Sequence, residues 1–161
     1  MISNDISSPK YRYLTKMKEE SKKIITRKTA EGVAIIVQGP DSRVLVSCRV
    51  DAKSAFFDYY QFPGGGVHAN ESPLDAAIRE LHEETGELVP PERFVYLGSD
   101  ERPNENGVGT YVGHCFLIHT ANGERFINQE PDKQTQWMFW SYEECNQYAS
   151  SFIPGLLAYL K

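Results

Sequence analysis

The segment from Ser72 to Gly86 constrains the fold of this 161-residue chain more than any other, because both ends of a helix are marked in it. Ser72 is a favourable N-cap, Pro73 suits the first helical position, and Gly86 suits a C-terminal cap. The apolar positions share one face of a helical wheel, and they are Leu74, Ala77, Ile78 and Leu81. The segment therefore predicts a helix over residues 73–85 with one face packed into a core.

Three carboxylates converge along the edge of that apolar face. At about 100° per residue, Glu83 and Glu84 fall within about 60° on either side of Glu80. Like charges in this arrangement cost stability unless something positive lies among them. Mg²⁺ prefers oxygen ligands and keeps several waters, one of which can become a nucleophile. The alternative is a solvated acidic helix in which Arg79 pairs with Glu83.

Strand-like segments lie on both sides of this helix. The apolar runs that predict strands are residues 32–37, 43–50, 94–98, 110–120 and 137–140. Residues 62–66, with three glycines, predict a flexible turn where the backbone approaches a ligand, and residues 100–109 predict a polar loop. Helices are expected to begin at Ser141 and to cover residues 153–160. This order predicts an α/β fold with a mixed sheet and helices on both faces.

Charge and composition limit the function classes. Residues 1–28 carry a net charge of +5 and the remaining residues a net charge of −10. A basic extension can attract nucleic acid, although lysine-rich termini usually only face solvent, and an acidic body needs a divalent metal to handle a polyanion. No apolar run approaches the roughly 20 residues that span a bilayer, so no membrane association is expected. The lack of a signal-type N-terminus and of paired cysteine motifs favours a cytoplasmic protein.

The glycine-rich turn and the helix together resemble the Nudix box. The matching pattern is Gly65, five residues, Glu71, seven residues, Arg79-Glu80-Leu81, one residue, Glu83-Glu84, one residue and Gly86. One position departs, because Glu87 stands where the family usually has an aliphatic residue. The order of strands and helices is also similar to a Nudix domain. The resemblance implies a Nudix α/β/α sandwich with a mixed sheet and a central catalytic helix over residues 29–161, preceded by a basic extension over residues 1–28.

The resemblance also implies an activity and a site. Nudix hydrolases cleave a diphosphate linked to another moiety with Mg²⁺, and Mn²⁺ is a possible substitute. The metal ligands that it implies are Gly65, through its carbonyl, Glu80, Glu83 and Glu84. Arg79 matches the arginine that orients the catalytic glutamates, and Glu71 matches a structural acid near the start of the helix. We expect Glu80 to be the general base.

Further candidates lie outside the box. Residues 130–139 resemble a stretch of MutT-like members, in which Glu130 would be a further metal ligand or a base rather than a simple loop acid. Arg49, at the end of the second expected strand, is either a phosphate contact or a surface residue. The full set expected to bind substrate is Arg49, Gly64, Gly65, Phe57 and Tyr60. The aromatic residues at 56, 57, 59 and 60 either stack on a base or belong to the core. Tyr111 and His114 are weaker candidates.

The substrate is expected to be a small nucleotide. A normal or damaged nucleoside triphosphate, cleaved to the monophosphate and pyrophosphate, is the leading prediction. Pro103 lies where ADP-ribose-cleaving members tend to carry proline, which makes ADP-ribose the alternative. The basic extension leaves RNA-cap hydrolysis open, and a non-catalytic Nudix binding module is disfavoured because every box acid is present. A homodimer is possible.

Overall fold

The computed structural model describes residues 29–104 and 108–160. The expected basic extension over residues 1–28 lies outside these ranges. Within them, no helix is both long and apolar enough to cross a membrane. The three cysteines, Cys48, Cys115 and Cys145, are free thiols.

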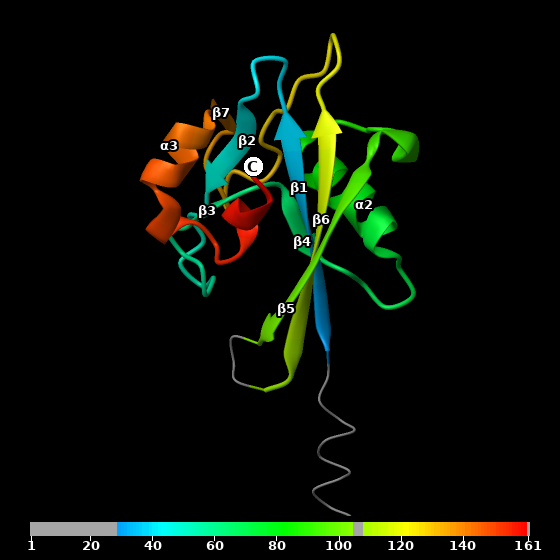
Figure 1. Ribbon diagram of the computed structural model, residues 1–161, viewed down its shortest axis with the longest axis vertical. Coiled ribbons are helices and arrows are strands. Elements are labelled where there is room, and N and C mark those ends of the chain that lie inside the picture. Colours follow the sequence, from blue (N-terminus) through cyan, green and yellow to red (C-terminus); the bar gives the residue numbers. More distant parts are fainter. Residues whose placement is uncertain (1–28, 105–107, 161) are drawn as a thin grey trace, which may run out of the picture.

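A seven-stranded mixed sheet forms the centre of the described structure (Figure 1). Its strands are β1 (Ala30–Gln38), β2 (Val44–Cys48), β3 (Tyr60–Gln61), β4 (Gly64–Gly66), β5 (Val95–Pro103), β6 (Thr110–His119) and β7 (Met138–Trp140). The main order is β3-β2-β1-β6-β5, while β4 pairs with β1 and β7 pairs with β2. Strands β1 and β6 are parallel, and the other pairs are antiparallel. The long central strand β1 therefore connects both halves of the sheet.

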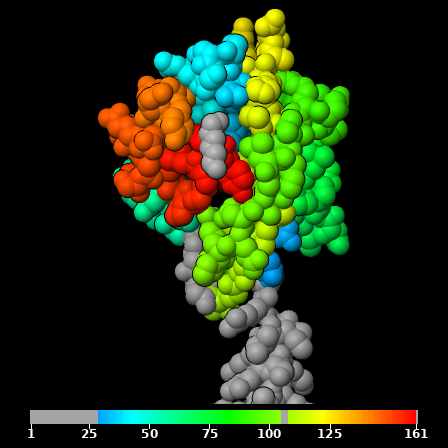
Figure 2. Space-filling view, viewed as in Figure 1, coloured from blue at the N-terminus to red at the C-terminus, as the bar shows by residue number. Residues whose placement is uncertain are grey.

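Helical layers cover both faces of this sheet. Helix α2 (Pro73–Thr85) lies on one side, with the 3-10 turn η1 (Pro91–Arg93) beyond its C-terminus. Helix α3 (Tyr142–Gln147) and the 3-10 turns η2 (Ala149–Ser151) and η3 (Leu156–Tyr159) lie on the other side (Figure 1). In Figure 2 the C-terminal segment, coloured red, packs between the orange segment of α3 and the green strand β5. The expected α/β/α sandwich is confirmed.

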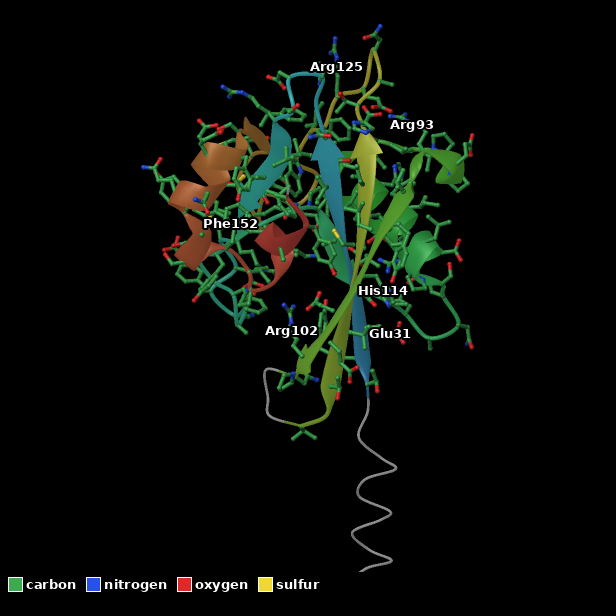
Figure 3. All side chains as sticks on the ribbon, in the orientation of Figure 1. Glu31, Arg93, Arg102, His114, Arg125 and Phe152 are labelled. Carbon is green, nitrogen blue, oxygen red and sulfur yellow. The ribbon has the colours of Figure 1, made fainter. Side chains whose placement is uncertain are left out.

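The alternation of β1 divides the core into two clusters. Ile35 and Val37 pack against Leu81 on the α2 side, whereas Ile36 packs with residues of the C-terminal segment on the other side. Figure 3 shows Phe152, a member of the second cluster, on the side that carries α3. Because successive strand residues point to opposite faces, one apolar strand supplies both cores.

Helix α2 has the expected bounds and caps. Ser72 Oγ accepts a hydrogen bond of 3.1 Å from the backbone of Asp75, and Gly86 ends the helix with a left-handed φ of 79°. Its fully buried apolar residues are Ala76, Ala77 and Leu81, so the apolar face is rotated slightly from the one expected. Glu80 and Glu84 lie beside this buried face and contact strand β4.

Three expectations about secondary structure are wrong. Strand β5 continues through the expected loop as far as Pro103, because it pairs with β6 up to Thr110. Residues 64–66 are strand β4 rather than a flexible turn, because they pair with β1. The last expected helix, over residues 153–160, is reduced to the 3-10 turn η3. In the first two cases, pairing with a neighbouring strand decides the outcome.

Leu81 offers a direct test of how α2 is held on the sheet. Its side chain is fully buried, whereas Leu88, just beyond the helix, is 71% exposed. We expect Leu81→Ala to lower the free energy of unfolding by about 2–5 kcal/mol, because it removes buried methyl groups and leaves a cavity. Leu88→Ala is the matched control and should change it by less than about 0.5 kcal/mol. Denaturant titration measures both, and equal losses would contradict this packing of α2.

Candidate functional site

Arg79 connects the start of helix α2 to its acidic edge. Its Nε and Nη2 atoms donate to the two carboxylate oxygens of Glu71 over 2.8 and 2.9 Å. Its Nη1 atom donates to Glu80 Oε1 over 2.6 Å and to Glu83 Oε2 over 3.2 Å. Its Nη2 atom also donates to the carbonyl oxygen of Gly66 over 2.8 Å. One guanidinium therefore orients three carboxylates and the end of β4.

Glu71 is the acid that holds this guanidinium in place. The side-chain hydrogen bonds from Arg79, with a 2.9 Å bond from the backbone N–H of His68, lower the pKa of Glu71 to about 2. The same contact with Glu71 raises the pKa of Arg79 above its usual range. Both groups therefore stay charged across the physiological pH range, as a structural ion pair requires.

The glycines of β4 allow the acidic edge of α2 to approach the sheet closely. A Cβ on Gly65 would lie 2.4 Å from the carboxylate of Glu80, so no other residue fits there without moving that carboxylate. A Cβ on Gly64 would lie 2.1 Å from the carbonyl oxygen of Val33. The backbone N–H of Gly64 instead donates to Glu84 Oε2 over 2.9 Å. Gly64 and Gly65 therefore serve close contact rather than flexibility.

Glu84 is a carboxyl group that is only 6% exposed. Burial raises its pKa to about 8, and the charges of Glu80 and Glu130 act in the same direction. The hydrogen bond from Gly64 and the positive charge of Arg49 oppose this rise in pKa. A buried acid beside two other acids favours a nearby cation, because a positive charge would stabilise its ionised form.

One cleft of about 220 Å³ collects most of the residues expected from the sequence. It is lined by Arg49, Gly64, Gly65, Glu80, Glu84, Glu130 and Lys133. Glu83 does not line it, because its side chain is 51% exposed and turned to Arg79. The cleft lies where α2, β4, the end of β2 and the loop with Glu130 meet.

The donor atoms around this cleft fit a hard divalent cation. They are the carboxylates of Glu80, Glu84 and Glu130, together with the backbone oxygens of β4. In residues 29–104 and 108–160, no three acidic, histidine or cysteine side chains are already grouped closely enough to hold a metal ion. Arg79 holds one oxygen of Glu80, and Lys133 Nζ lies 2.5 Å from Glu130 Oε1. A bound cation would therefore compete with these two ion pairs.

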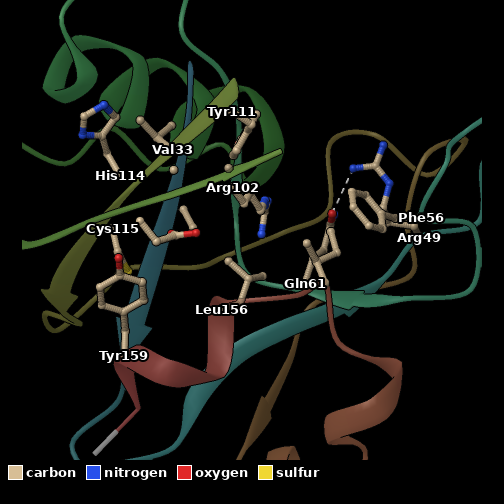
Figure 4. A pocket seen from close by; sticks show the side chains of 16 residues that line it. Val33, Arg49, Phe56, Gln61, Arg102, Tyr111, His114, Cys115, Leu156 and Tyr159 are labelled. Atoms are coloured by element: carbon tan, nitrogen blue, oxygen red, sulfur yellow. Dashed lines mark hydrogen bonds between the residues drawn. The ribbon is translucent and has the colours of Figure 1, made fainter. Parts of the chain in front are cut away.

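A second cavity of about 150 Å³ adjoins the acidic cleft (Figure 4). Arg49, Gly64 and Gly65 line both spaces. Further from the carboxylates, the guanidinium of Arg102 lies 4.7 Å from the centre of the Tyr111 ring and donates to the carbonyl oxygen of Pro154. Two strands, β5 and β6, thus present a cationic and aromatic wall to this cavity.

The aromatic residues between β2 and β3 are divided between this cavity and the core. Phe56 lines the cavity, whereas Phe57 and Tyr60 line neither space. Phe57 is exposed, and the ring of Tyr60 packs 4.6 Å from that of Trp140 and 5.7 Å from that of Phe152. The structure therefore places Phe56, rather than the two expected residues, in the lining of the second cavity.

The structure also locates the weaker candidates Tyr111 and His114, and Pro103, on which the ADP-ribose alternative rests. Tyr111 and His114 line the second cavity, and the His114 ring nitrogens lie 3.1 Å from Tyr96 Oη and 3.1 Å from Glu31 Oε2. Figure 3 shows His114 and Glu31 beside one another on the sheet. Pro103 ends β5 in an exposed position and lines neither space.

Among the residues of the second cavity that sequence reasoning missed, four carry a nitrogen or oxygen atom in the side chain. They are Gln61, Asp100, Arg102 and Tyr159. Arg102 and Asp100 fall in the segment expected to be a loop, so their alternation along a strand was not visible. Gln61 directly precedes the Phe62–Gly66 turn, and that proximity was the one available signal.

Comparison with known proteins agrees with this geometry. A family model of the Nudix domain matches residues 28–157. This chain belongs to the Nudix family. The expected family is therefore confirmed.

The curated relatives match only part of this Nudix chain and are themselves longer. An RNA pyrophosphohydrolase of Halorhodospira halophila is 47% identical over 70 residues, which are 44% of this chain and 35% of that protein. The human m7GpppN-mRNA hydrolase NUDT17 is 38% identical over 109 residues, which cover 65% of this chain and 32% of that protein. The chain thus spans about a third of the length of these relatives.

Solved structures share the fold of this Nudix domain. The solution structure of the E. coli ORF135 protein has a TM-score of 0.63 and 26% identity, and the match covers 83% of this chain and 86% of that one. A MutT NUDIX hydrolase from Burkholderia pseudomallei has a TM-score of 0.62 and 24% identity, covering 73% and 86%. The match to the second structure supports the fold alone.

The raised pKa of Glu84 makes the stability of the metal-free protein depend on pH. The folded-state pKa of about 8 lies above the ordinary value of 4.5, so the contribution is complete below pH 4.5 and is lost as pH rises through about 8. In chelator-treated protein, the unfolding free energy of wild type relative to Glu84→Gln should fall by on the order of a few kcal/mol across that window. Denaturant titrations at several pH values measure it, and a constant difference would refute the desolvation of Glu84.

Proposed function

We propose that this chain hydrolyses a diphosphate bond of a nucleotide with the help of a divalent metal ion. A (deoxy)nucleoside triphosphate, cleaved to the monophosphate and pyrophosphate, is the leading substrate class. The observation that carries the proposal is a positively charged side chain, that of Arg49, beside a cleft lined by carboxylates. Arg49 lines the space with Glu80 and Glu84, yet no carboxylate in the described ranges forms an ion pair with it. An unneutralised guanidinium beside a metal-type cleft suits a phosphate ligand.

Within this proposal, Glu80, Glu84, Glu130 and the Gly65 carbonyl would hold Mg²⁺ or Mn²⁺, and Glu83 would contribute from the rim. The ion, when bound, would neutralise phosphate charge and lower the pKa of water. The chain's own contribution is to keep the acids oriented. Arg79 restrains Glu80, and the Gly64 N–H restrains Glu84.

The proton acceptor in this proposal is Glu80. Arg79 engages its Oε1 atom, and Oε2 makes no hydrogen bond to any residue that the structure describes. Glu84 is less suited to this role, because its Oε2 is held by Gly64 and the side chain is more deeply buried. A general base must reach the proton that it removes, and the more accessible acid satisfies this better.

The nucleoside would occupy the second cavity in Figure 4. Phe56 and Tyr111 offer aromatic surfaces for a base, and Arg102 lies against the Tyr111 ring. Arg49, shared by both spaces, would contact the phosphate that joins the two parts of the substrate. Pro103 lies outside both spaces, so its position does not favour ADP-ribose.

A second candidate is hydrolysis at the 5′ end of RNA. The observation that favours it is the activity for which two sequence relatives are named, an RNA pyrophosphohydrolase and an m7GpppN-mRNA hydrolase. We assign residues 29–161 to the Nudix domain and residues 1–28, with their net charge of +5, to an extension that would contact RNA phosphates. Binding of a short RNA should then weaken steeply as salt rises.

Glu84→Gln tests the metal-dependent mechanism. Glutamine retains an oxygen for the Gly64 N–H, so the fold should persist, but it removes the ligand charge. Turnover should fall about a thousandfold or more, which corresponds to a loss of about 4 kcal/mol of transition-state stabilisation. Glu143→Gln, an exposed change on α3, is the control and should retain wild-type turnover. Near-normal turnover in Glu84→Gln would overturn the assignment.

A substrate panel with Mg²⁺ separates the candidates. It contains the common nucleoside and deoxynucleoside triphosphates, oxidised dGTP, ADP-ribose, a dinucleoside polyphosphate, and triphosphorylated and capped RNA. We expect monophosphate and pyrophosphate from one mononucleotide. Preferential release of pyrophosphate from RNA would favour the second candidate instead. No turnover of any compound with Mg²⁺ or Mn²⁺ would contradict both.

A further inference from the structure

A hydrogen-bonded network of buried polar side chains lies where the acidic cleft meets the second cavity. Arg49 Nη1 donates to Gln61 Oε1 over 3.0 Å, which Figure 4 shows as a dashed line. Gln61 Nε2 donates to Gln134 Oε1 over 2.6 Å, and Ser47 Oγ donates to the same oxygen over 3.4 Å. Ser47, Gln61 and Gln134 are all buried. Buried polar groups of this kind normally satisfy all their donors and acceptors.

This hydrogen-bonded network leaves two donors unpaired, and the direction of its hydrogen bonds explains why. A guanidinium only donates, so Gln61 must turn its oxygen toward Arg49 and its NH₂ group toward Gln134. Gln134 must then accept, and its own Nε2 is buried without a partner among the described residues, as is Arg49 Nε. Reversing both amides would pair Gln134 Nε2 but would direct the Gln61 NH₂ group at the guanidinium. The charge of Arg49 therefore determines the orientation of both glutamines.

The neutral amide is the important property of Gln61. A carboxylate at this position would also hold Arg49, but it would neutralise the guanidinium as Glu71 neutralises Arg79. A glutamine restrains the side chain by a hydrogen bond and places no negative charge of its own beside the guanidinium. Among the described residues, Arg49 is thus held by a neutral acceptor and has no carboxylate within ion-pair distance.

At its Gln134 end, this hydrogen-bonded network is joined to the loop that carries Glu130. The backbone N–H of Gln134 donates to the Glu130 carbonyl over 3.2 Å. Asn128 Nδ2 donates to the Gln134 carbonyl over 2.7 Å, and Asn128 Oδ1 accepts from the backbone of Glu130 over 2.8 Å. Arg49 and Glu130, which line the same cleft from different segments, are therefore connected through the two glutamines.

We propose that Gln61, supported by Gln134, is a positioning residue that orients Arg49 and keeps its charge unneutralised for a substrate phosphate. This inference rests on the proposed function, in which Arg49 contacts that phosphate. In this inference, the buried amides of Gln61 and Gln134 affect substrate affinity only through Arg49.

The first test is a double-mutant cycle with Gln61→Met and Arg49→Met, read as KM and kcat for the best substrate of the panel. Methionine has nearly the volume of glutamine but cannot accept the hydrogen bond. Gln61→Met should raise KM about tenfold with a smaller change in kcat, and it should add nothing further in the Arg49→Met background. Gln147→Met, on the exposed end of α3, is the matched control and should match wild type.

Gln61→Glu separates charge from geometry. The carboxylate still accepts from Arg49, and Gln134 can turn its amide to donate its unpaired Nε2, so thermal unfolding should stay close to that of wild type. The neutralised guanidinium should nevertheless raise KM at least as much as in Gln61→Met. Calorimetric titration with inorganic tripolyphosphate and Mg²⁺ should show the same order of affinities, independently of turnover.

The outcomes distinguish this inference from the proposed function. Active wild type with additive Gln61 and Arg49 effects, or with unchanged KM in both Gln61 variants, overturns the inference alone. Wild type that binds tripolyphosphate without hydrolysing any substrate overturns the proposed hydrolysis, while the order of affinities still decides the role of Gln61. Wild type that neither binds nor hydrolyses overturns both.

Discussion

The bidentate ion pair between Arg79 and Glu71 is the interaction on which the rest of the site depends. It joins the loop before α2 to the second turn of that helix, and the same guanidinium reaches Glu80 and the carbonyl of Gly66. Strand β4 and the acidic edge of the helix are thereby held at one separation. Because hydrogen bonds from Arg79 hold the pKa of Glu71 near 2, this connection persists across the physiological pH range.

The close approach of the β4 backbone to the carboxylates of α2 is the second constraint. It buries a carboxyl group, and burial makes the ionised form of that group less stable. Glu84 is buried and its pKa rises to about 8, which would destabilise the ionised form unless a positive charge balanced it. Gly65 lets a second carboxylate come equally close to β4, because a side chain at this position would displace the carboxylate of Glu80. Repulsion and burial among its own carboxylates thus favour a cation in this site, although the ligands are not grouped in advance around a metal position.

Local signals in the sequence predicted the parts of the structure that local chemistry determines. The caps of α2 at Ser72 and Gly86 and the spacing of its glutamates required only neighbouring residues. Contacts between separate segments decided the parts that were missed. Strand β5 reaches Pro103 because β6 lies beside it, and Phe56 rather than Phe57 faces the cavity because of the path of an irregular loop. The amide chain through Gln61 and Gln134 joins segments 73 residues apart, and no periodicity in the sequence marks it.

The two arginines of the site differ in the kind of partner that holds them, and in the function that we propose this difference gives them different roles. Arg79 is surrounded by carboxylates, so its charge is used within the protein and its contribution is orientation. Arg49 is held by the neutral oxygen of Gln61, so its charge remains directed at the cleft. A site for an anionic substrate needs both kinds of cation, because a guanidinium already paired with acids has little attraction left for a phosphate. The choice of amide or carboxylate next to each arginine therefore separates structural charge from recognition charge in this domain.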